Sequence, residues 1–254
     1  MTAHERVAAA IAAANDDGRT ALVPFITAGY PEPKDFISTL QAVAAVGDVV
    51  EIGIPFSDPM ADGMTIQRSS FEALQKGVSL VWIFDELEKS GGIDAPLVMM
   101  SYLNPLLAFG YEKLAARALE TGVCAFIVPD LPFEESDQIR GALEEQGIGL
   151  IQLVTPATPD DRLRTLCTAS RGFVYAVTIT GITGGDVGLP SDLADYLDKV
   201  ASLSEIPVCA GFGIRVAADV AAVGKHASGA IVGSALVEVL ERGEDPTAFL
   251  QSLR

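Results

Sequence analysis

The fold is decided by the stretch Asp48-Val-Val-Glu-Ile-Gly-Ile-Pro-Phe-Ser-Asp-Pro-Met-Ala-Asp-Gly63. Its first half is an almost continuous apolar run, which is typical of a parallel strand covered on both faces. Its second half is a loop rich in Gly, Pro and Asp that exceeds the roughly 2–6 residues usual between elements. A buried strand that ends in a long polar loop predicts an α/β protein with its chemistry at the carboxyl ends of the strands.

Seven further apolar runs alternate along the chain with amphipathic stretches, which favours repeated βα units. Helical patterns include Leu114–Leu119, Asp137–Gln146 and Leu193–Leu203. Eight such units in 254 residues predict a single (β/α)8 TIM-type barrel over residues 1–254. A doubly wound open sheet is the alternative, and the strand count favours the closed barrel. The eight runs are Ala21–Thr27, Asp48–Gly53, Pro96–Ser101, Val123–Val128, Ile148–Val154, Gly172–Thr178, Ile206–Ala210 and Ser228–Val232.

Several helix ends are also predicted. Thr2 and Glu5 have capping-box spacing before an Ala-rich stretch to Asn15, and Gly18 can end that helix. Such an extra N-terminal helix before the first strand can cover the bottom of the barrel. Three other glycines each follow a helical pattern and suit the C′ position just past its end. They are Gly122, Gly147 and Gly224.

Charge and composition exclude several classes of partner. The chain has 34 Asp and Glu against 17 Lys and Arg, a formal charge of −17, which disfavours nucleic acid and anionic membranes. No stretch resembles a secretion signal or a membrane span, and the three cysteines suit small core positions in a reducing compartment. We therefore expect a cytoplasmic protein that holds any anionic ligand through backbone N–H groups.

Two carboxylates stand out at the second strand. Glu51 alternates with Val50 and Ile52, so it points into the barrel if those two face the helices. A carboxyl group in so apolar a setting should have a raised pKa, which suits an acid or base near neutral pH. The alternative is a buried Glu satisfied by a Tyr or a backbone donor. Asp62 lies in the following loop, where its alternative role is a turn residue or helix cap.

Glycine-rich turns after the seventh and eighth strands favour phosphate binding. Barrels frequently hold phosphate there through loop amides and the N-terminus of a short helix. The turns read Gly211-Phe-Gly213 and Gly233-Ser234, and Thr183-Gly-Gly185 lies in a second long loop from Ile179 to Pro190. Their alternative interpretation is ordinary tight turns.

Other chemistries are disfavoured by what the strands lack. All six lysines fall outside the predicted strands, which argues against a Schiff-base aldolase in the barrel core. The two histidines, His4 and His226, lie far from strand ends and form no cluster, so we expect no metal site. Acid–base chemistry by carboxylates and a tyrosine remains.

Motifs along nearly the whole chain are similar to those of the tryptophan synthase alpha subunit family. The strand-two signature Glu51–Gly63 with its continuation Thr65–Gln67 is the most specific of them. Met64 departs from the family's usual Pro, and Gly185-Asp-Val187 stands where many relatives carry a basic residue, which puts loop closure in doubt. The remaining motifs are Pro24–Gly29, Tyr102 with Asn104, Pro129–Pro132, Gly181–Gly184, Gly211–Gly213 and Gly233-Ser234.

The resemblance implies a lyase of tryptophan biosynthesis that cleaves indole-3-glycerol phosphate to indole and glyceraldehyde 3-phosphate. It implies that Glu51 shuttles protons, that Asp62 holds the indole N–H, and that Tyr175 supports Glu51 and the substrate. The substrate-binding residues it implies are Phe25, Met100, Ile127 and Phe212 for the indole, Gly184, Gly213, Gly233 and Ser234 for the phosphate, and Thr183 approaching Asp62.

The resemblance also implies a beta subunit partner in an alpha2-beta2 tetramer. Pyridoxal phosphate is then expected on that partner and no cofactor on this chain. Asp58, Pro59 and Asn104 are expected to face the partner. Two other hypotheses stay open: a stand-alone indole lyase on the same scaffold, and a barrel that binds a phosphorylated metabolite without converting it.

Overall fold

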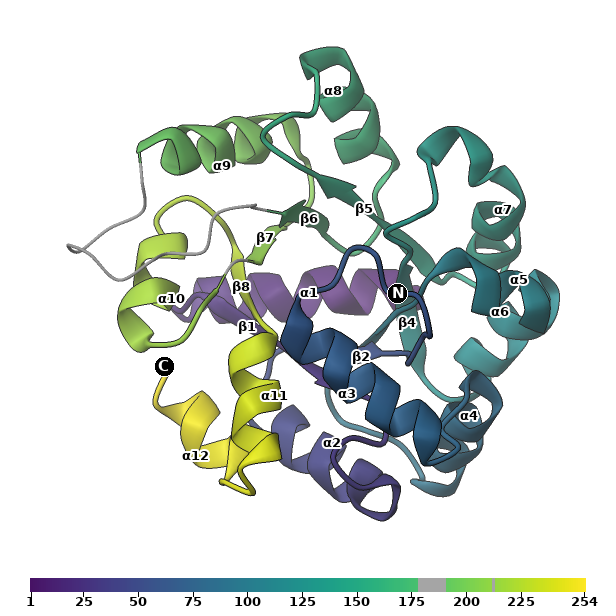
Figure 1. Cartoon of the computed structure of the whole chain (residues 1–254). Helices are drawn as coiled ribbons and strands as arrows, with labels where there is room; N and C mark the ends of the chain where they lie inside the picture. Colours follow the sequence, from purple (N-terminus) through teal and green to yellow (C-terminus); the bar gives the residue numbers. More distant parts are fainter. Residues whose placement is uncertain (178–190, 212) are drawn as a thin grey trace.

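Eight parallel strands close into a barrel in the order β1 to β8, surrounded by helices (Figure 1). The computed structural model describes residues 1–177, 191–211 and 213–254. The closed barrel predicted from the sequence is confirmed, and the open-sheet alternative is wrong because β1 pairs with β8. The strands are β1 Ala21–Thr27, β2 Val50–Gly53, β3 Leu97–Met100, β4 Val123–Ile127, β5 Gly149–Val154, β6 Val174–Val177, β7 Val208–Gly211 and β8 Gly229–Val232.

The helices form a ring outside the barrel, as the alternating pattern predicted (Figure 1). The predicted helices at 114–119, 137–146 and 193–203 correspond to α6, α7 and α9. The helices are α1 Ala3–Asp16, α2 Phe36–Ala44, α3 Met64–Gln75, α4 Leu80–Lys89, α5 Leu103–Phe109, α6 Tyr111–Glu120, α7 Asp137–Glu145, α8 Asp160–Ala169, α9 Ser191–Leu203, α10 Ala217–Val223, α11 Ser234–Glu241 and α12 Pro246–Gln251, with short 3-10 turns η1 Pro33–Asp35 and η2 Phe133–Glu135.

The strands bury both faces, which explains their continuous apolar runs. One side chain set packs inside the barrel and includes Val23, Val98 and Ile151. The alternate set, such as Val50 and Ile52, packs in the larger core between strands and helices. This period-two alternation places Glu51 on the interior face, as predicted.

The N-terminal helix α1 covers one end of the barrel interior. Its buried residues Val7 and Ile11 belong to the same core cluster as Phe173 at the start of β6. The predicted capping box is present, since the Thr2 N–H donates to the Glu5 carboxylate at 2.6 Å. Gly18 follows with a left-handed φ of 74°. The extra N-terminal helix is therefore confirmed.

One predicted glycine role is wrong in its physical reason. Gly122 and Gly147 have left-handed φ angles of 77° and 70°, but Gly224 has a φ of −62°. Gly224 is needed for space instead, because a Cβ there would lie 1.9 Å from the Thr20 Oγ1. Among the residues described, no helix has the length and apolar character needed to cross a bilayer.

Candidate functional site

A cavity of about 330 Å³ opens at the carboxyl ends of the strands, where barrel enzymes carry their chemistry. It brings the two predicted carboxylates together with the phosphate-type turns. The lining residues come from seven of the eight strands, from the loops after β2, β4, β7 and β8, and from the starts of α3 and α11. They are Phe25, Glu51, Ala61, Asp62, Gly63, Ile66, Met100, Pro129, Leu153, Tyr175, Val177, Gly211, Gly213, Ile231, Gly233 and Ser234.

Glu51 is the most deeply placed polar group in this cavity. Strand β2 holds it level with Phe25 on β1 and Val98 on β3, and it is only 1% exposed. Its Oε2 has no hydrogen-bond partner among the described residues, so the alternative of a Glu satisfied by a Tyr or backbone donor is wrong for that atom. Burial, helped by the charge of Asp62, raises the pKa of Glu51 to about 8.

Asp62 lies on the β2–α3 loop and faces the same cavity. Its side chain is not used to cap α3, because Gly63 occupies the N-cap. Instead its carboxylate accepts a hydrogen bond from the Tyr102 hydroxyl at 3.1 Å, and that hydroxyl accepts from the Ala61 N–H at 2.8 Å. Burial raises the pKa of Asp62, while the bond from Tyr102 opposes that rise. The helix-cap alternative is thus wrong, and the carboxylate, held by Tyr102, lines the cavity.

The sequence identifies Tyr102 only as part of a family motif and does not predict that it anchors Asp62. It follows β3, is 4% exposed and stacks on Phe56 with ring centroids 5.0 Å apart. No local pattern could have revealed this contact, because it joins residues 40 positions apart on different loops.

Tyr175 stands on the interior face of β6, as predicted, and lines the cavity. Burial and the charges of Glu51 and Asp62 raise its pKa well above the ordinary value, so the phenol stays protonated. A Cβ on Gly211 would lie 2.6 Å from the Tyr175 hydroxyl. Gly211 therefore makes room for a tyrosine, a reason that differs from the backbone approach to phosphate expected from the sequence.

The apolar wall contains some predicted residues and several that were missed. Phe25 and Met100 line the cavity, whereas Ile127 is fully buried in the barrel core and is not among the lining residues. Ile66 is contributed by α3. The interior alternation on β5, β6 and β8 was a signal that could have found the rest, which are Leu153, Val177 and Ile231.

The predicted phosphate turns also line the cavity. Gly213 has a left-handed φ of 46°, and Gly233 and Ser234 stand at the N-terminus of α11. A helix N-terminus presents free N–H groups and a positive dipole end, which suits an anion. The predicted contacts of Thr183, Gly184 and Phe212 lie outside the described residues.

The three residues predicted to face a partner lie on the outer surface near this end of the barrel. Asp58 and Asn104 are exposed and Pro59 is half-buried. Two large apolar side chains nearby in sequence are also exposed, Met60 at 83% and Leu107 at 57%. Exposed apolar groups of this kind are compatible with an interface.

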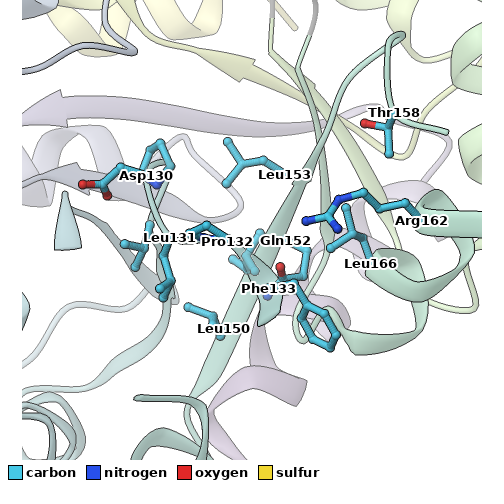
Figure 2. A pocket seen from close by; sticks show the side chains of 13 residues that line it. Asp130, Leu131, Pro132, Phe133, Leu150, Gln152, Leu153, Thr158, Arg162 and Leu166 are labelled. Carbon is cyan, nitrogen blue, oxygen red and sulfur yellow. The ribbon is translucent and has the colours of Figure 1, made fainter. Parts of the chain in front are cut away.

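A second cavity of similar size adjoins the first and shares Pro129 and Leu153 with it (Figure 2). Its charged groups are already paired within the chain. Asp130 accepts from the Leu103 N–H at 2.8 Å, and Arg162 forms a two-point ion pair with Glu134. The unpaired carboxyl of Glu51 therefore distinguishes the first cavity as the functional one. Within residues 1–177, 191–211 and 213–254, no cluster of side chains suits a metal ion.

The raised pKa of Glu51 predicts how stability changes with pH. Because the native pKa of about 8 exceeds the ordinary value of 4.5, the folded state binds more protons between those two values. This group therefore lowers stability as the pH rises through that window. When the pH is raised from 5 to 9, the stability of Glu51→Gln relative to the native chain should increase by on the order of a few kcal/mol. Urea unfolding of both proteins at pH 5 and at pH 9 measures this change. A stability difference that is the same at both pH values would contradict the prediction.

A tight contact at the base of the apolar wall predicts a second effect. A Cβ on Gly53 would lie 2.3 Å from the Phe25 Cζ, so Gly53→Ala must displace this ring, which lines the cavity. We expect a stability loss of roughly 1–3 kcal/mol and weaker ligand binding, read from thermal unfolding and titration. Gly141→Ala is the control, since nothing lies within 4 Å of the added Cβ in helix α7. Normal binding by the Gly53 variant would show that the ring does not shape the site.

The chain is similar in sequence and in fold to proteins of one known family. The family model described as "Tryptophan synthase alpha chain" matches residues 11–253. The tryptophan synthase alpha chains of Desulfovibrio desulfuricans and Bacillus cereus are 43% and 42% identical, over 94% and 96% of this chain and 96% of each relative. The alpha subunit structure from Legionella pneumophila has a TM-score of 0.88 at 30% identity, covering 100% of this chain and 97% of that one. This chain belongs to the tryptophan synthase alpha chain family.

Proposed function

We propose that this cavity cleaves indole-3-glycerol phosphate into indole and glyceraldehyde 3-phosphate, the lyase reaction of its family. The observation that carries the proposal is the buried carboxyl of Glu51, without a hydrogen-bond partner among the described residues, facing the same cavity as Asp62. The lining includes apolar side chains that suit an indole ring, such as Phe25, Met100 and Ile231. It also includes turns and a helix N-terminus that suit a phosphate.

In the proposed reaction Glu51 donates one proton to the substrate and then accepts another from it. Its pKa of about 8 leaves it protonated at neutral pH, so it can donate to C3 of the indole. The ring then carries a positive charge and serves as the electron sink. The glycerol hydroxyl next to the scissile bond loses its proton to Glu51 and becomes the aldehyde carbonyl. The carbon–carbon bond breaks, its electron pair returns to the ring, and neutral indole leaves.

Asp62 is proposed to act by charge rather than by proton transfer. Its carboxylate accepts the indole N–H and stabilises the positive charge that develops on the ring. The bond from Tyr102 holds that carboxylate in place. Tyr175, whose phenol stays protonated, is proposed to support Glu51 and the substrate from the interior of β6.

The remaining binding roles follow the shape of the cavity. Phe25 and Met100 are proposed to contact the indole, and Phe212 is proposed to contribute to the same pocket. Ile127 supports the wall only from the barrel core, in the cluster against which Met100 packs. Gly213, Gly233 and Ser234 are proposed to hold the phosphate together with Gly184. Thr183 is proposed to approach Asp62 when the loop around it closes.

The chain is proposed to work beside a beta subunit in an alpha2-beta2 tetramer. The family's pyridoxal phosphate belongs to that beta subunit, and the reaction above needs no cofactor on this chain. Asp58 and Met60 are exposed on the β2–α3 loop that also carries Asp62, and Asn104 is exposed shortly after β3. These exposed side chains support a partner surface close to the cavity. Three buried free cysteines support a reducing, cytoplasmic setting for the complex.

Indole release from indole-3-glycerol phosphate by the purified chain, with and without a beta subunit, tests the function. We expect slow release alone and much faster release with the partner. Fast release that the partner does not change would favour the stand-alone lyase. Binding without any product, under both conditions, would leave only a phosphorylated-metabolite binder and would reject the lyase.

A further inference from the structure

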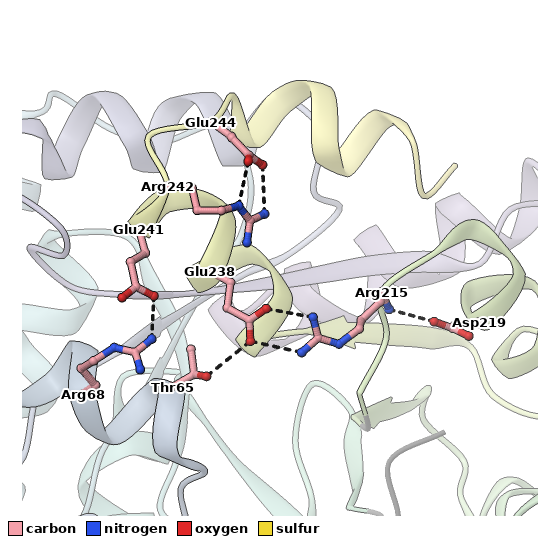
Figure 3. Close-up of polar contacts among 8 residues, drawn as sticks. All are labelled: Thr65, Arg68, Arg215, Asp219, Glu238, Glu241, Arg242 and Glu244. Atoms are coloured by element: carbon pink, nitrogen blue, oxygen red, sulfur yellow. Dashed lines mark hydrogen bonds and ion pairs between the residues drawn. The ribbon is translucent and has the colours of Figure 1, made fainter. Parts of the chain in front are cut away.

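Glu238 on helix α11 lies among three loops of the functional site (Figure 3). Its carboxylate accepts two hydrogen bonds from the Arg215 guanidinium, at 2.8 and 3.1 Å, from the β7–α10 loop. It also lies 3.4 Å from the Thr65 hydroxyl, which is a long contact, at the start of α3. The same three loops carry Gly213, Asp62 and the Gly233-Ser234 turn that line the cavity.

Arg215 is anchored at both its backbone and its side chain. Its N–H donates to the Asp219 carboxylate at 2.8 Å, and that oxygen also accepts from the Val216 N–H at 3.1 Å. Ile214, between Gly213 and Arg215, is 2% exposed. The bidentate pair therefore ties the Gly213 turn to α11, whose N-terminus forms the other phosphate turn.

The position of Glu238 creates an electrostatic problem that Arg215 solves. Ser234 and Glu238 are four residues apart on α11, about 6 Å along the axis and on one face of the helix. A carboxylate there lies within a Debye length of about 8 Å of the helix end and repels an anion bound to it. The Arg215 guanidinium, paired directly with Glu238, cancels that charge and lowers the pKa of the Glu238 carboxyl.

We propose that the Arg215–Glu238 ion pair determines how tightly the site holds the phosphate of its substrate. It does so by neutralising the α11 carboxylate nearest to the phosphate turns, whose charge would otherwise repel the bound anion. Arg215 and Glu238 are positioning residues in this proposal, because neither lines the cavity. The inference rests on the proposed function, which supplies the phosphorylated substrate.

The structure offers a matched control on the same helix, α11. Arg68 on α3 pairs with Glu241 on α11 at 2.6 Å (Figure 3). This pair lies three residues further along each helix than the contact between Thr65 and Glu238. Its exposure is similar, with side chains 46% and 36% exposed against 58% and 25% for Arg215 and Glu238. Arg68→Ala therefore removes an inter-helix ion pair at a greater distance from the phosphate turns.

The test compares the native chain with Arg215→Ala, Arg215→Ala/Glu238→Ala and Arg68→Ala. KM for indole-3-glycerol phosphate and kcat are measured, and inorganic phosphate binding is titrated by calorimetry. We expect Arg215→Ala to raise KM and the phosphate Kd about tenfold, or about 1.4 kcal/mol, with kcat nearly unchanged. The double variant should recover most of that loss because the uncompensated carboxylate is gone, and Arg68→Ala should match the native chain.

Two results would overturn the inference. One is an unchanged phosphate Kd in Arg215→Ala, and the other is a double variant no better than the single one. Thermal unfolding of each variant separates these results from loss of the fold. A native chain that binds phosphate but releases no indole would reject the proposed function alone, because the phosphate titration still tests the ion pair.

Discussion

Glu51→Gln should reduce indole release by about 10³-fold or more, since a positioned acid–base group contributes roughly 10²–10⁴-fold. Glutamine keeps the shape of the side chain but cannot give a proton to C3 of indole or accept one from the glycerol hydroxyl. The loss should fall on kcat, because the buried carboxyl is proposed to act on the reacting atoms rather than on the phosphate. Steady-state kinetics with the beta subunit present measures the effect.

The fold should survive this substitution, which makes the result interpretable. Glu51 is 1% exposed and its Oε2 has no partner among the described residues, so a neutral amide removes the cost of protonating and burying this carboxyl on folding. Circular dichroism and unaltered binding of inorganic phosphate serve as controls. Glu51→Asp is the matched variant, because it keeps the carboxyl but withdraws it by one methylene, and it should retain part of the activity. Full activity in Glu51→Gln would reject the assignment.

The pH dependence of kcat provides an independent view of the same group. With a pKa of about 8, Glu51 is protonated at pH 7 and loses its proton above that value. The donor form therefore declines as the pH rises, and so should the rate of cleavage. A rate that rises steadily through pH 9 would mean that another group supplies the proton.

The barrel was predictable because its strands carry a strong local signal. The continuous apolar runs and their period-two alternation predicted the strand positions and the interior face of Glu51, both of which the structure bears out. Glycine was harder to interpret. Glycine is required at Gly147 because the backbone is left-handed there, and at Gly224 because there is no room for a Cβ. The sequence alone does not distinguish these two requirements.

Contacts between loops were not predictable from one sequence. The Tyr102–Asp62 bond spans 40 residues and the Arg215–Glu238 pair spans 23, and each joins segments that follow different strands of the barrel. Polar side chains on such loops are ordinarily solvated, so no residue pattern marks the few that pair. The sequence could predict the carboxylates of the site, but not the groups that hold them.

Asp62→Asn should lower kcat about 10²-fold, the usual loss when one group that stabilises developing charge is removed. Asparagine is almost the same size, but it carries no charge to oppose the positive indole ring. Its amide can also turn its NH2 group toward the indole N–H, so two donors then face each other. Because the charge develops only as C3 is protonated, the effect should appear mainly in kcat.

Two variants of neighbouring residues separate charge from loop structure. Asp58→Asn removes a carboxylate from the same loop, but Asp58 is exposed and does not line the cavity, so activity without a partner should stay native. Tyr102→Phe keeps Asp62 but removes the hydroxyl that donates to it at 3.1 Å and accepts from the Ala61 N–H. We expect an intermediate loss there, because the carboxylate keeps its charge and loses its orientation. Equal losses in Asp62→Asn and Tyr102→Phe would mean that loop order, rather than the charge of Asp62, limits the reaction.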